Sequence, residues 1–226
     1  MISNIQPVSG LTSTLFKAKA YIELLKVRLS LLVAFSCAFG YGLATRGSVN
    51  WEVLAMLFLG GFLLSGASGA INQILERDFD KLMTRTQNRP IPTGRLSLTE
   101  ANIFAGICLM LSLFILWVYT NPLTVLLSFV SMVLYSFVYT PLKRVGPIAV
   151  FVGAIPGALP PLLGWIAATG SISHEALIIF GIQFIWQFPH FWAIAWVADD
   201  DYKKAGFKLL PSGGGCLLYT SDAADE

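Results

Sequence analysis

Charged residues are scarce in this chain, and that scarcity excludes an ordinary soluble domain. They account for 12% of its 226 residues, whereas hydrophobic residues account for 55% and the mean hydropathy is +0.69. Soluble domains carry about 25% charged residues, so this composition belongs in a lipid bilayer. The formal net charge is only +2, and we expect no nucleic-acid partner.

Cysteine is also rare, with three residues in the whole chain. Cys37 and Cys108 lie inside apolar stretches, Cys216 is near the end, and there is no CxxC motif or Cys/His cluster. The sequence therefore supports neither a zinc site nor a disulfide framework. A signal-peptide layout is missing too. The first apolar run has full spanning length and no small-residue cleavage site, so we expect a retained helix.

What the chain does contain is six apolar segments, each about long enough to cross the hydrocarbon core. They cover residues 24–44, 51–71, 101–119, 122–140, 146–168 and 175–198. The sequence therefore predicts an all-α fold, a polytopic membrane bundle of six transmembrane helices. Small residues at 60–61, 65–70 and 153–157 predict close helix contacts. Pro156, Pro160 and Pro161 predict that the fifth helix is kinked or locally broken.

The basic residues lie almost entirely on one side of these segments. Of the 15 Lys and Arg residues, 14 fall before the first segment or early in it, after the second, after the fourth or after the sixth. Only Arg46 falls on the opposite side. By the positive-inside bias the basic side is cytoplasmic, so the polar clusters described next are expected to face the cytoplasm.

One polar block, residues 72–95, interrupts the apolar sequence after the second segment. Asn72, Glu76 and Asp80 are spaced i, i+4, i+8, which places them within a stripe of about 80° on a helix. Asp78 projects from roughly the opposite side. Oxygen ligands on one stripe, followed by arginines, suit a diphosphate bound with Mg²⁺. The alternative is a solvated loop of mixed charge between two membrane helices.

Two further polar features lie on the same side. Asp199, Asp200 and Asp201 close the sixth segment, and two facing carboxylate clusters could hold two Mg²⁺ ions on one diphosphate. A solvated helix end is the alternative. Lys143 and Arg144 follow the fourth segment as a phosphate clamp or as simple membrane anchors. Nearby Tyr139 would lie at the cavity edge, where an aromatic face stabilises a developing carbocation.

His190 is the one histidine inside a predicted span. An ionisable residue at membrane depth is a functional hypothesis by default. Two interpretations stay open: a neutral histidine bonded to a neighbouring helix, or a group that ligates or positions a bound haem.

Together these segments resemble the UbiA-type intramembrane prenyltransferases, in particular the protohaem IX farnesyltransferase (haem O synthase) branch. The resemblance covers residues 20 to about 211 and is carried by 72–95 (NQILERDFDKLMTRTQNRPIPTGR), 139–144 (YTPLKR), 152–165 (VGAIPGALPPLLGW) and 187–211 (QFPHFWAIAWVADDDYKKAGFKLLP). The first of these is general to the superfamily. The RTxNRP continuation and the last two segments are more specific to the haem branch.

The resemblance implies a function and a set of site residues. Mg²⁺ would be held by Asn72, Glu76, Asp80 and Asp201, with Asp78 assisting, although Glu76 stands where the superfamily often has Asp. The diphosphate would be bound by Arg85, Arg89, Lys143, Arg144 and Lys204, and Tyr139 would join the catalytic group. His190 falls in the Pro-His segment typical of the branch. The implied reaction transfers farnesyl from farnesyl diphosphate to a vinyl group of haem B, with addition of water, giving haem O and diphosphate.

The resemblance also implies a setting in the bacterial inner membrane, in contact with the lipid bilayer, with haem A synthase or oxidase assembly factors as partners. Because the family has nine helices, we expect residues 1–212 to form one domain that is incomplete at its C-terminus. Residues 213–226 are expected to be a non-native tail. Two other functions stay open: a prenyltransferase for an aromatic quinone precursor, and a transporter that binds haem or lipid without catalysis or Mg²⁺.

Overall fold

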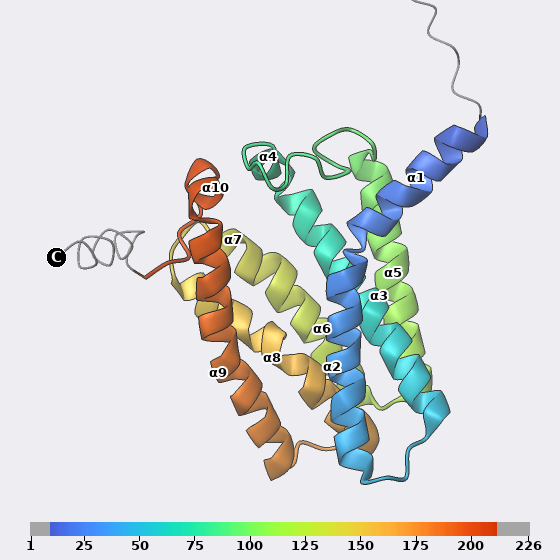
Figure 1. Ribbon diagram of the computed structural model, residues 1–226. Coiled ribbons are helices and arrows are strands. Elements are labelled where there is room, and N and C mark those ends of the chain that lie inside the picture. Colours follow the sequence, from blue (N-terminus) through green and yellow to red (C-terminus); the bar gives the residue numbers. More distant parts are fainter. Residues whose placement is uncertain (1–9, 212–226) are drawn as a thin grey trace, which may run out of the picture.

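The structure of the chain is a computed structural model that describes residues 10–211 (Figure 1). The predicted tail at 213–226 lies outside the described residues. Within them every regular element is a helix, and the order along the chain is α1 (Gly10–Leu24), α2 (Val27–Thr45), α3 (Trp51–Leu75), α4 (Arg77–Asp80), α5 (Leu98–Tyr119), α6 (Pro122–Val133), the π-helix η1 (Leu134–Tyr139), α7 (Thr140–Leu142), α8 (Ile148–Thr169), α9 (His174–Val197) and α10 (Asp199–Lys204).

Six of these helical stretches are long and apolar enough to cross a membrane, which confirms the predicted bundle. They are α2, α3, α5, the continuous run of α6, η1 and α7, then α8 and α9. Large apolar side chains such as Leu32, Phe114 and Ile185 are exposed on their outer faces, as expected for a surface that meets lipid rather than water. The chain is therefore an integral membrane protein.

Short capping motifs at the loops define where the helices begin. Asn50 accepts from the backbone N–H groups of Glu52 and Val53 at the start of α3. Ser97 and Glu100 form a reciprocal capping box at the start of α5. Such caps satisfy N–H groups that have no partner within the first helical turn.

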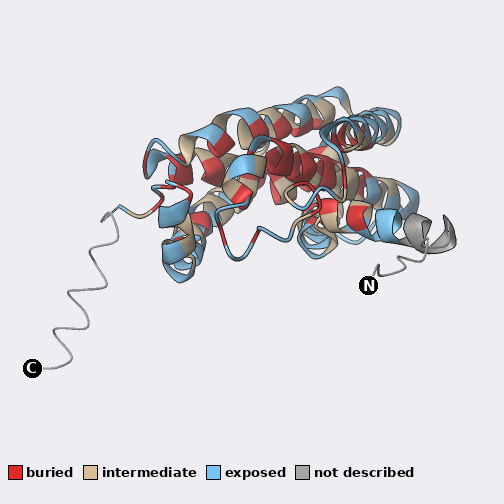
Figure 2. Ribbon diagram, turned by 90° about the horizontal axis from the view of Figure 1, so that it is seen from above, coloured by how far each residue is buried: buried red, intermediate tan, exposed pale blue. Residues whose placement is uncertain are grey.

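Helix α8 is the centre of the bundle. In the membrane-spanning part of α8, 67% of the residues are buried. In α9, which lies at the edge of the bundle, only 6% are buried. Figure 2, viewed along the bundle, shows the buried residues gathered in the middle and the exposed ones around the rim. Helix α2 packs on α8 and on α3, and α3 packs on α5. The close contacts predicted from small residues are present: a Cβ atom on Gly157 would meet the Gln187 side chain at 2.5 Å.

The sequence predicted a kink or a local break in the proline-rich helix. The break is absent, because α8 continues without interruption from Ile148 to Thr169. A proline inside a helix removes the N–H that the carbonyl four residues earlier would use. Pro161 therefore leaves the Gly157 carbonyl without its helical donor. Gln187 Nε2, from α9, donates to that oxygen at 3.4 Å. A neighbouring helix thus compensates for the lost hydrogen bond, as bilayer-embedded backbone requires.

Candidate functional site

The polar segments gather at one end of the bundle. The loop that carries α4, between α3 and α5, and helix α10 lie at the same end in Figure 1. The side chain of Asp201, in α10, accepts from the backbone N–H groups of Thr84 and Arg85, at 3.0 and 2.9 Å. The two predicted carboxylate clusters are therefore joined through the 81–90 loop, although they are far apart in the sequence.

The predicted stripe of Asn72, Glu76 and Asp80 is present, but not on one continuous helix. Helix α3 ends at Leu75, and Glu76 adopts φ −95°, ψ 5° before α4 begins. The i, i+4 hydrogen bonds persist across this break, from Glu76 N to Asn72 O and from Asp80 N to Glu76 O. As whole residues these three are 2%, 5% and 0% exposed, whereas the side chain of Asp78 is 62% exposed. The three residues are therefore buried together and Asp78 lies apart from them, as the helical spacing predicts.

Both buried carboxylates are paired with cations from elsewhere in the chain. Lys143 Nζ lies 2.8 Å from Glu76 Oε1, and Arg89 Nη1 lies 2.7 Å from Asp80 Oδ2. Burial disfavours the charge on Lys143, but attraction to Glu76 outweighs it and the pKa of that lysine is raised. Buried charges are normally paired with an opposite charge or bound to a metal ion. Arg89 and Lys143, which the sequence predicted to bind the diphosphate, are therefore paired in this structure with two of the predicted metal ligands.

Asn72 is held by two residues that the sequence analysis did not single out. Its Nδ2 donates to Thr140 Oγ1 at 3.1 Å, and its Oδ1 accepts from Lys26 Nζ at 3.4 Å. The hydroxyl of Thr140 in turn donates to the carbonyl of Tyr135 at 2.9 Å. The sequence identified Lys26 only as one of the basic residues on the side predicted to be cytoplasmic. Its position at the start of a predicted span gave no indication that it contacts Asn72.

Tyr139 lies beside this charged cluster, at the end of the π-helix η1. It is 5% exposed, and Lys143 Nζ lies 4.8 Å from its ring centroid. The absence of a side chain at Gly153 gives the ring its space, because a Cβ atom there would meet Tyr139 Cδ2 at 2.6 Å. On another side the ring packs against Phe191 of α9, with centroids 5.6 Å apart. Isolated π turns often mark functional sites in helices.

Asp201 keeps its charge through backbone hydrogen bonds. The amides of Arg85 and Thr84 hold the pKa of its carboxyl far below the usual aspartate range. Lys204 Nζ adds a contact at 3.2 Å. Lys26, by contrast, holds its charge less readily. Burial and the nearby cations Arg89 and Lys143 lower its pKa to about 7.

Five predicted site residues are not brought into the buried cluster. Asp201 contacts Thr84, Arg85 and Lys204 instead of Glu76 or Asp80. The side chains of Arg85 and Lys204 are exposed at the loop contact, and exposed Arg144 lies 4.6 Å over the ring of Phe79. His190 is exposed on α9, where it stacks on Trp186 with centroids 6.4 Å apart. Its neighbour Phe191 is the residue that contacts Tyr139. The structure thus separates the histidine from the ion pairs around Glu76 and Asp80.

The oxygen atoms of Asn72, Glu76 and Asp80 fit Mg²⁺ in kind. They are hard donors, they are buried, and each faces a positively charged group that a divalent cation would replace. Within residues 10–211 no three His, Cys, Asp or Glu side chains lie close enough together to hold a metal ion. Glu76, Asp80 and Asp201 therefore do not converge on one metal position in this structure, where Glu76 and Asp80 are paired with Lys143 and Arg89.

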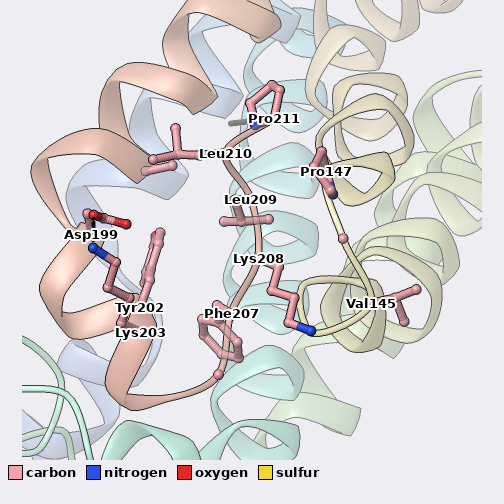
Figure 3. A pocket seen from close by; sticks show the side chains of 13 residues that line it. Val145, Pro147, Asp199, Tyr202, Lys203, Phe207, Lys208, Leu209, Leu210 and Pro211 are labelled. Atoms are coloured by element: carbon pink, nitrogen blue, oxygen red, sulfur yellow. Dashed lines mark ion pairs between the residues drawn. The ribbon is translucent and has the colours of Figure 1, made fainter. Parts of the chain in front are cut away.

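A pocket of about 370 Å³ opens beside the cluster, between α10, the segment 207–211 and the residues before α8. Figure 3 shows Tyr202, Phe207 and Leu209 along its wall, with Asp199 and Lys203 side by side. Asn72, Glu76 and Asp80 are not among its lining residues. The buried ion pairs of Glu76 and Asp80 therefore do not line this pocket.

Comparison with known protein sequences finds one matching family and several relatives. The sequence profile of the UbiA prenyltransferase family matches residues 33–215. A Protoheme IX farnesyltransferase from Cytophaga hutchinsonii is 52% identical over 203 residues, which are 90% of this chain and 71% of that protein. The protein of the same name from Christiangramia forsetii is 50% identical over 84% of this chain. The chain spans 63% of the length of that second relative.

Solved structures share the fold at lower identity. A structure described as digeranylgeranylglyceryl phosphate synthase has a TM-score of 0.73 and 21% identity, covering 91% of this chain and 72% of its own. A UbiA homologue from Archaeoglobus fulgidus bound to DMAPP and Mg²⁺ has a TM-score of 0.68 and 22% identity, covering 90% of this chain and 74% of its own. These similarities establish the helical architecture.

Proposed function

This chain belongs to the UbiA prenyltransferase family, and from that premise we propose that it transfers the farnesyl group of farnesyl diphosphate to a vinyl group of haem B. Water adds in the same reaction, and the products are haem O and diphosphate. The observation that carries the proposal is the buried pair of carboxylates, Glu76 and Asp80, each matched by a basic residue at the end of the bundle. We propose that the chain lies in the bacterial inner membrane and that this end of the bundle faces the cytoplasm.

Arg89 and Lys143 have the chemistry to bind the departing diphosphate. Guanidinium and ammonium groups donate charge-assisted hydrogen bonds to phosphate oxygens. In a partly water-excluded site these bonds favour breakage of the allylic C–O bond, because negative charge develops on the leaving oxygen. Arg85, Arg144 and Lys204 would complete the contacts from the exposed rim.

Mg²⁺, when bound, would neutralise the diphosphate and activate it as a leaving group. Asn72, Glu76, Asp80 and Asp201 are the residues proposed to hold the ion, with Asp78 assisting. For Asn72 the proposal is supported by two contacts: its amide nitrogen donates to Thr140 Oγ1, and its oxygen faces a cation, Lys26 Nζ.

Tyr139 is proposed to stabilise positive charge on the allylic group. The face of an aromatic ring attracts a cation when water is excluded, and Tyr139 is buried between Lys143 and Phe191. The vinyl carbon of haem is electron-rich enough to attack that cation without a strong protein base. The same ring would serve an aromatic acceptor.

The choice of haem B as acceptor rests on the relatives of 50% and 52% identity, both called Protoheme IX farnesyltransferase. His190 is proposed to contact the macrocycle from α9, where its exposed ring leaves room for a bulky ligand. A quinone precursor is the second candidate acceptor, because the diphosphate site would be identical. Haem A synthase or oxidase assembly factors would receive the product.

The test is an assay of membranes that contain the chain, supplied with haem B, farnesyl diphosphate and Mg²⁺. Chromatography should detect a more hydrophobic haem from the parent and none from Asp80→Ala or Asp201→Ala. Asp200→Ala is the matched control, since that side chain is exposed on the same helix as Asp201. Product from all three variants would refute the proposed site. Prenylation of an aromatic acid, with haem B unchanged, would move the assignment to the quinone branch.

A further inference from the structure

The pocket between α10, the segment 207–211 and residues 145–147 lies at the level where two membrane spans end. The span of α9 ends at Val197, two residues before Asp199, and the span of α8 begins at Ile148, directly after Pro147. Asp199 and Pro147 both line the pocket. Spans end where the hydrocarbon core meets the lipid headgroups. The pocket therefore lies at headgroup depth.

The charged side chains that line this pocket within residues 10–211 are Asp199, Lys203 and Lys208. Asp199 Oδ2 lies 2.7 Å from Lys203 Nζ within α10, and Figure 3 shows the two side by side. Lys208 is exposed, and in the part of the chain that the structure describes it takes part in no ion pair. Two lysines against one aspartate leave the pocket with one positive charge. A ligand group with a single negative charge would balance it.

The rest of the pocket wall is largely apolar and includes Val145, Pro147, Leu210 and Pro211. Val145 is an exposed apolar side chain, and so is Ile148, the first residue of α8. An apolar surface thus continues from the pocket onto the helix that enters the bilayer. The volume of about 370 Å³ lies within the range of pockets that bind small molecules, about 300–1,000 Å³.

We propose that this pocket binds the headgroup of an anionic phospholipid from the leaflet that borders this end of the bundle. The phosphodiester, with one negative charge, would accept hydrogen bonds from the ammonium groups of Lys208 and Lys203. The acyl chains would follow the apolar surface along α8 into the bilayer. Basic pockets at the cytoplasmic ends of membrane helices bind lipid headgroups in this way. The proposal goes beyond the proposed function and does not depend on it, because neither Glu76 nor Asp80 lines the pocket.

A lipid in this position would stabilise the segment 207–211. Lys208 N donates to Lys143 O at 2.7 Å, and the ring of Phe207 packs against Tyr202 with centroids 5.6 Å apart. These contacts hold the segment between α10 and the residues before α8. A headgroup in the pocket would add contacts to both sides. We therefore expect an anionic lipid to raise the thermal unfolding midpoint of the chain.

The alternative is that Lys203 and Lys208 are simple anchors, attracted to any negatively charged surface. A diffuse attraction would not depend on the shape of the pocket, and any exposed lysine at this end of the bundle would contribute equally. Gly146 offers a way to separate the two roles. It lines the pocket, and a Cβ atom there meets nothing within 4 Å. Gly146→Leu therefore adds a side chain at the pocket wall while the charges stay the same.

The experiment titrates short-chain phosphatidylglycerol into the purified full chain in uncharged detergent and follows binding by calorimetry. Short-chain phosphatidylcholine is the zwitterionic comparison. The parent should bind one phosphatidylglycerol about fivefold or more tightly than phosphatidylcholine, because a lysine near the headgroup contributes about 1 kcal/mol. Lys208→Met and Gly146→Leu should each weaken binding of phosphatidylglycerol by about that factor, whereas Lys208→Arg should keep it. Lys19→Met, which removes an exposed lysine of α1, is the matched control and should bind as the parent does.

Equal binding of the two lipids by the parent, or unchanged binding of phosphatidylglycerol by Lys208→Met or Gly146→Leu, would overturn the proposal. An effect of Lys19→Met as large as that of Lys208→Met would also overturn it, since the attraction would then be diffuse. Glycerol 3-phosphate that binds as tightly as phosphatidylglycerol would show that the pocket takes a soluble phosphate rather than a lipid. Gel filtration of each variant checks folding, and the two Lys208 variants decide the question should Gly146→Leu aggregate.

Discussion

Arg89 and Asp80 form an ion pair that closes the loop after α4, with one guanidinium nitrogen donating to both carboxylate oxygens. Arg89 Nη1 lies 2.8 Å from Oδ1 and 2.7 Å from Oδ2 of Asp80, and the aspartate side chain is fully buried while that of Arg89 is 20% exposed. Removing one partner of such a pair leaves an uncompensated charge, at a cost of about 3–5 kcal/mol. We expect Arg89→Met to lower the free energy of unfolding in mixed detergent micelles by about that amount.

The matched control is Arg85→Met, four residues away, whose side chain is exposed. It should change the free energy of unfolding by less than about 0.5 kcal/mol. Combining Arg89→Met with Asp80→Asn should recover part of the loss, because the buried charge is then removed with its partner. Equal effects of the two arginine variants would contradict a stabilising role for the pair.

A second prediction concerns the crossing of α2 and α8. A Cβ atom on Gly164 would overlap the carbonyl oxygen of Cys37 and lie 2.7 Å from Tyr41 N, so the two backbones touch there. Gly164→Ala should force the helices apart and lower the thermal unfolding midpoint. Gly106→Ala is the control, since a Cβ atom there meets nothing within 4 Å and alanine favours helix by up to about 1 kcal/mol. A midpoint for Gly164→Ala at or above the control would show that the contact is not needed.

The six spans could be predicted from the sequence because their length and hydropathy are local properties. The same holds for the face shared by Asn72, Glu76 and Asp80, which follows from helical spacing alone. The break at Glu76 was not visible, since no proline or glycine marks it. The unbroken course of α8 was not visible either, because the donor from Gln187 comes from another helix.

The ion pairs within the site could not be predicted from the sequence either. Lys143 and Glu76 are 67 residues apart, and spacing along one chain says nothing about a contact of that range. Lys26 adopts a left-handed conformation, with φ 48° and ψ 53°, and its side chain lies against Gly69 of α3. The common reason is that tertiary contacts, rather than local propensity, select these conformations.

Thr140 gives a third prediction, on the orientation of Asn72. Its hydroxyl donates to Tyr135 O and accepts from Asn72 Nδ2. Thr140→Val preserves the shape but removes both bonds, so the amide is free to turn. Given the proposed function, the Mg²⁺ concentration for half-maximal activity should rise about fivefold, equivalent to about 1 kcal/mol. Thr140→Ser should stay close to the parent. A valine variant with unchanged Mg²⁺ dependence would show that Thr140 does not orient Asn72.

The last prediction follows from the lowered pKa of Asp201, held there by the N–H groups of Arg85 and Thr84. A carboxyl with a lowered pKa contributes stability above its ordinary value, and loses it only as the pH falls towards the lowered one. Slow amide exchange at Thr84 and Arg85, corrected for intrinsic rates, should therefore persist from about pH 8 to about pH 5. Asp201→Asn should lose this protection at every pH, whereas Asp200→Asn should keep it. Loss of protection in the parent between about pH 6 and pH 5 would mean that a different group, titrating near neutrality, holds the loop.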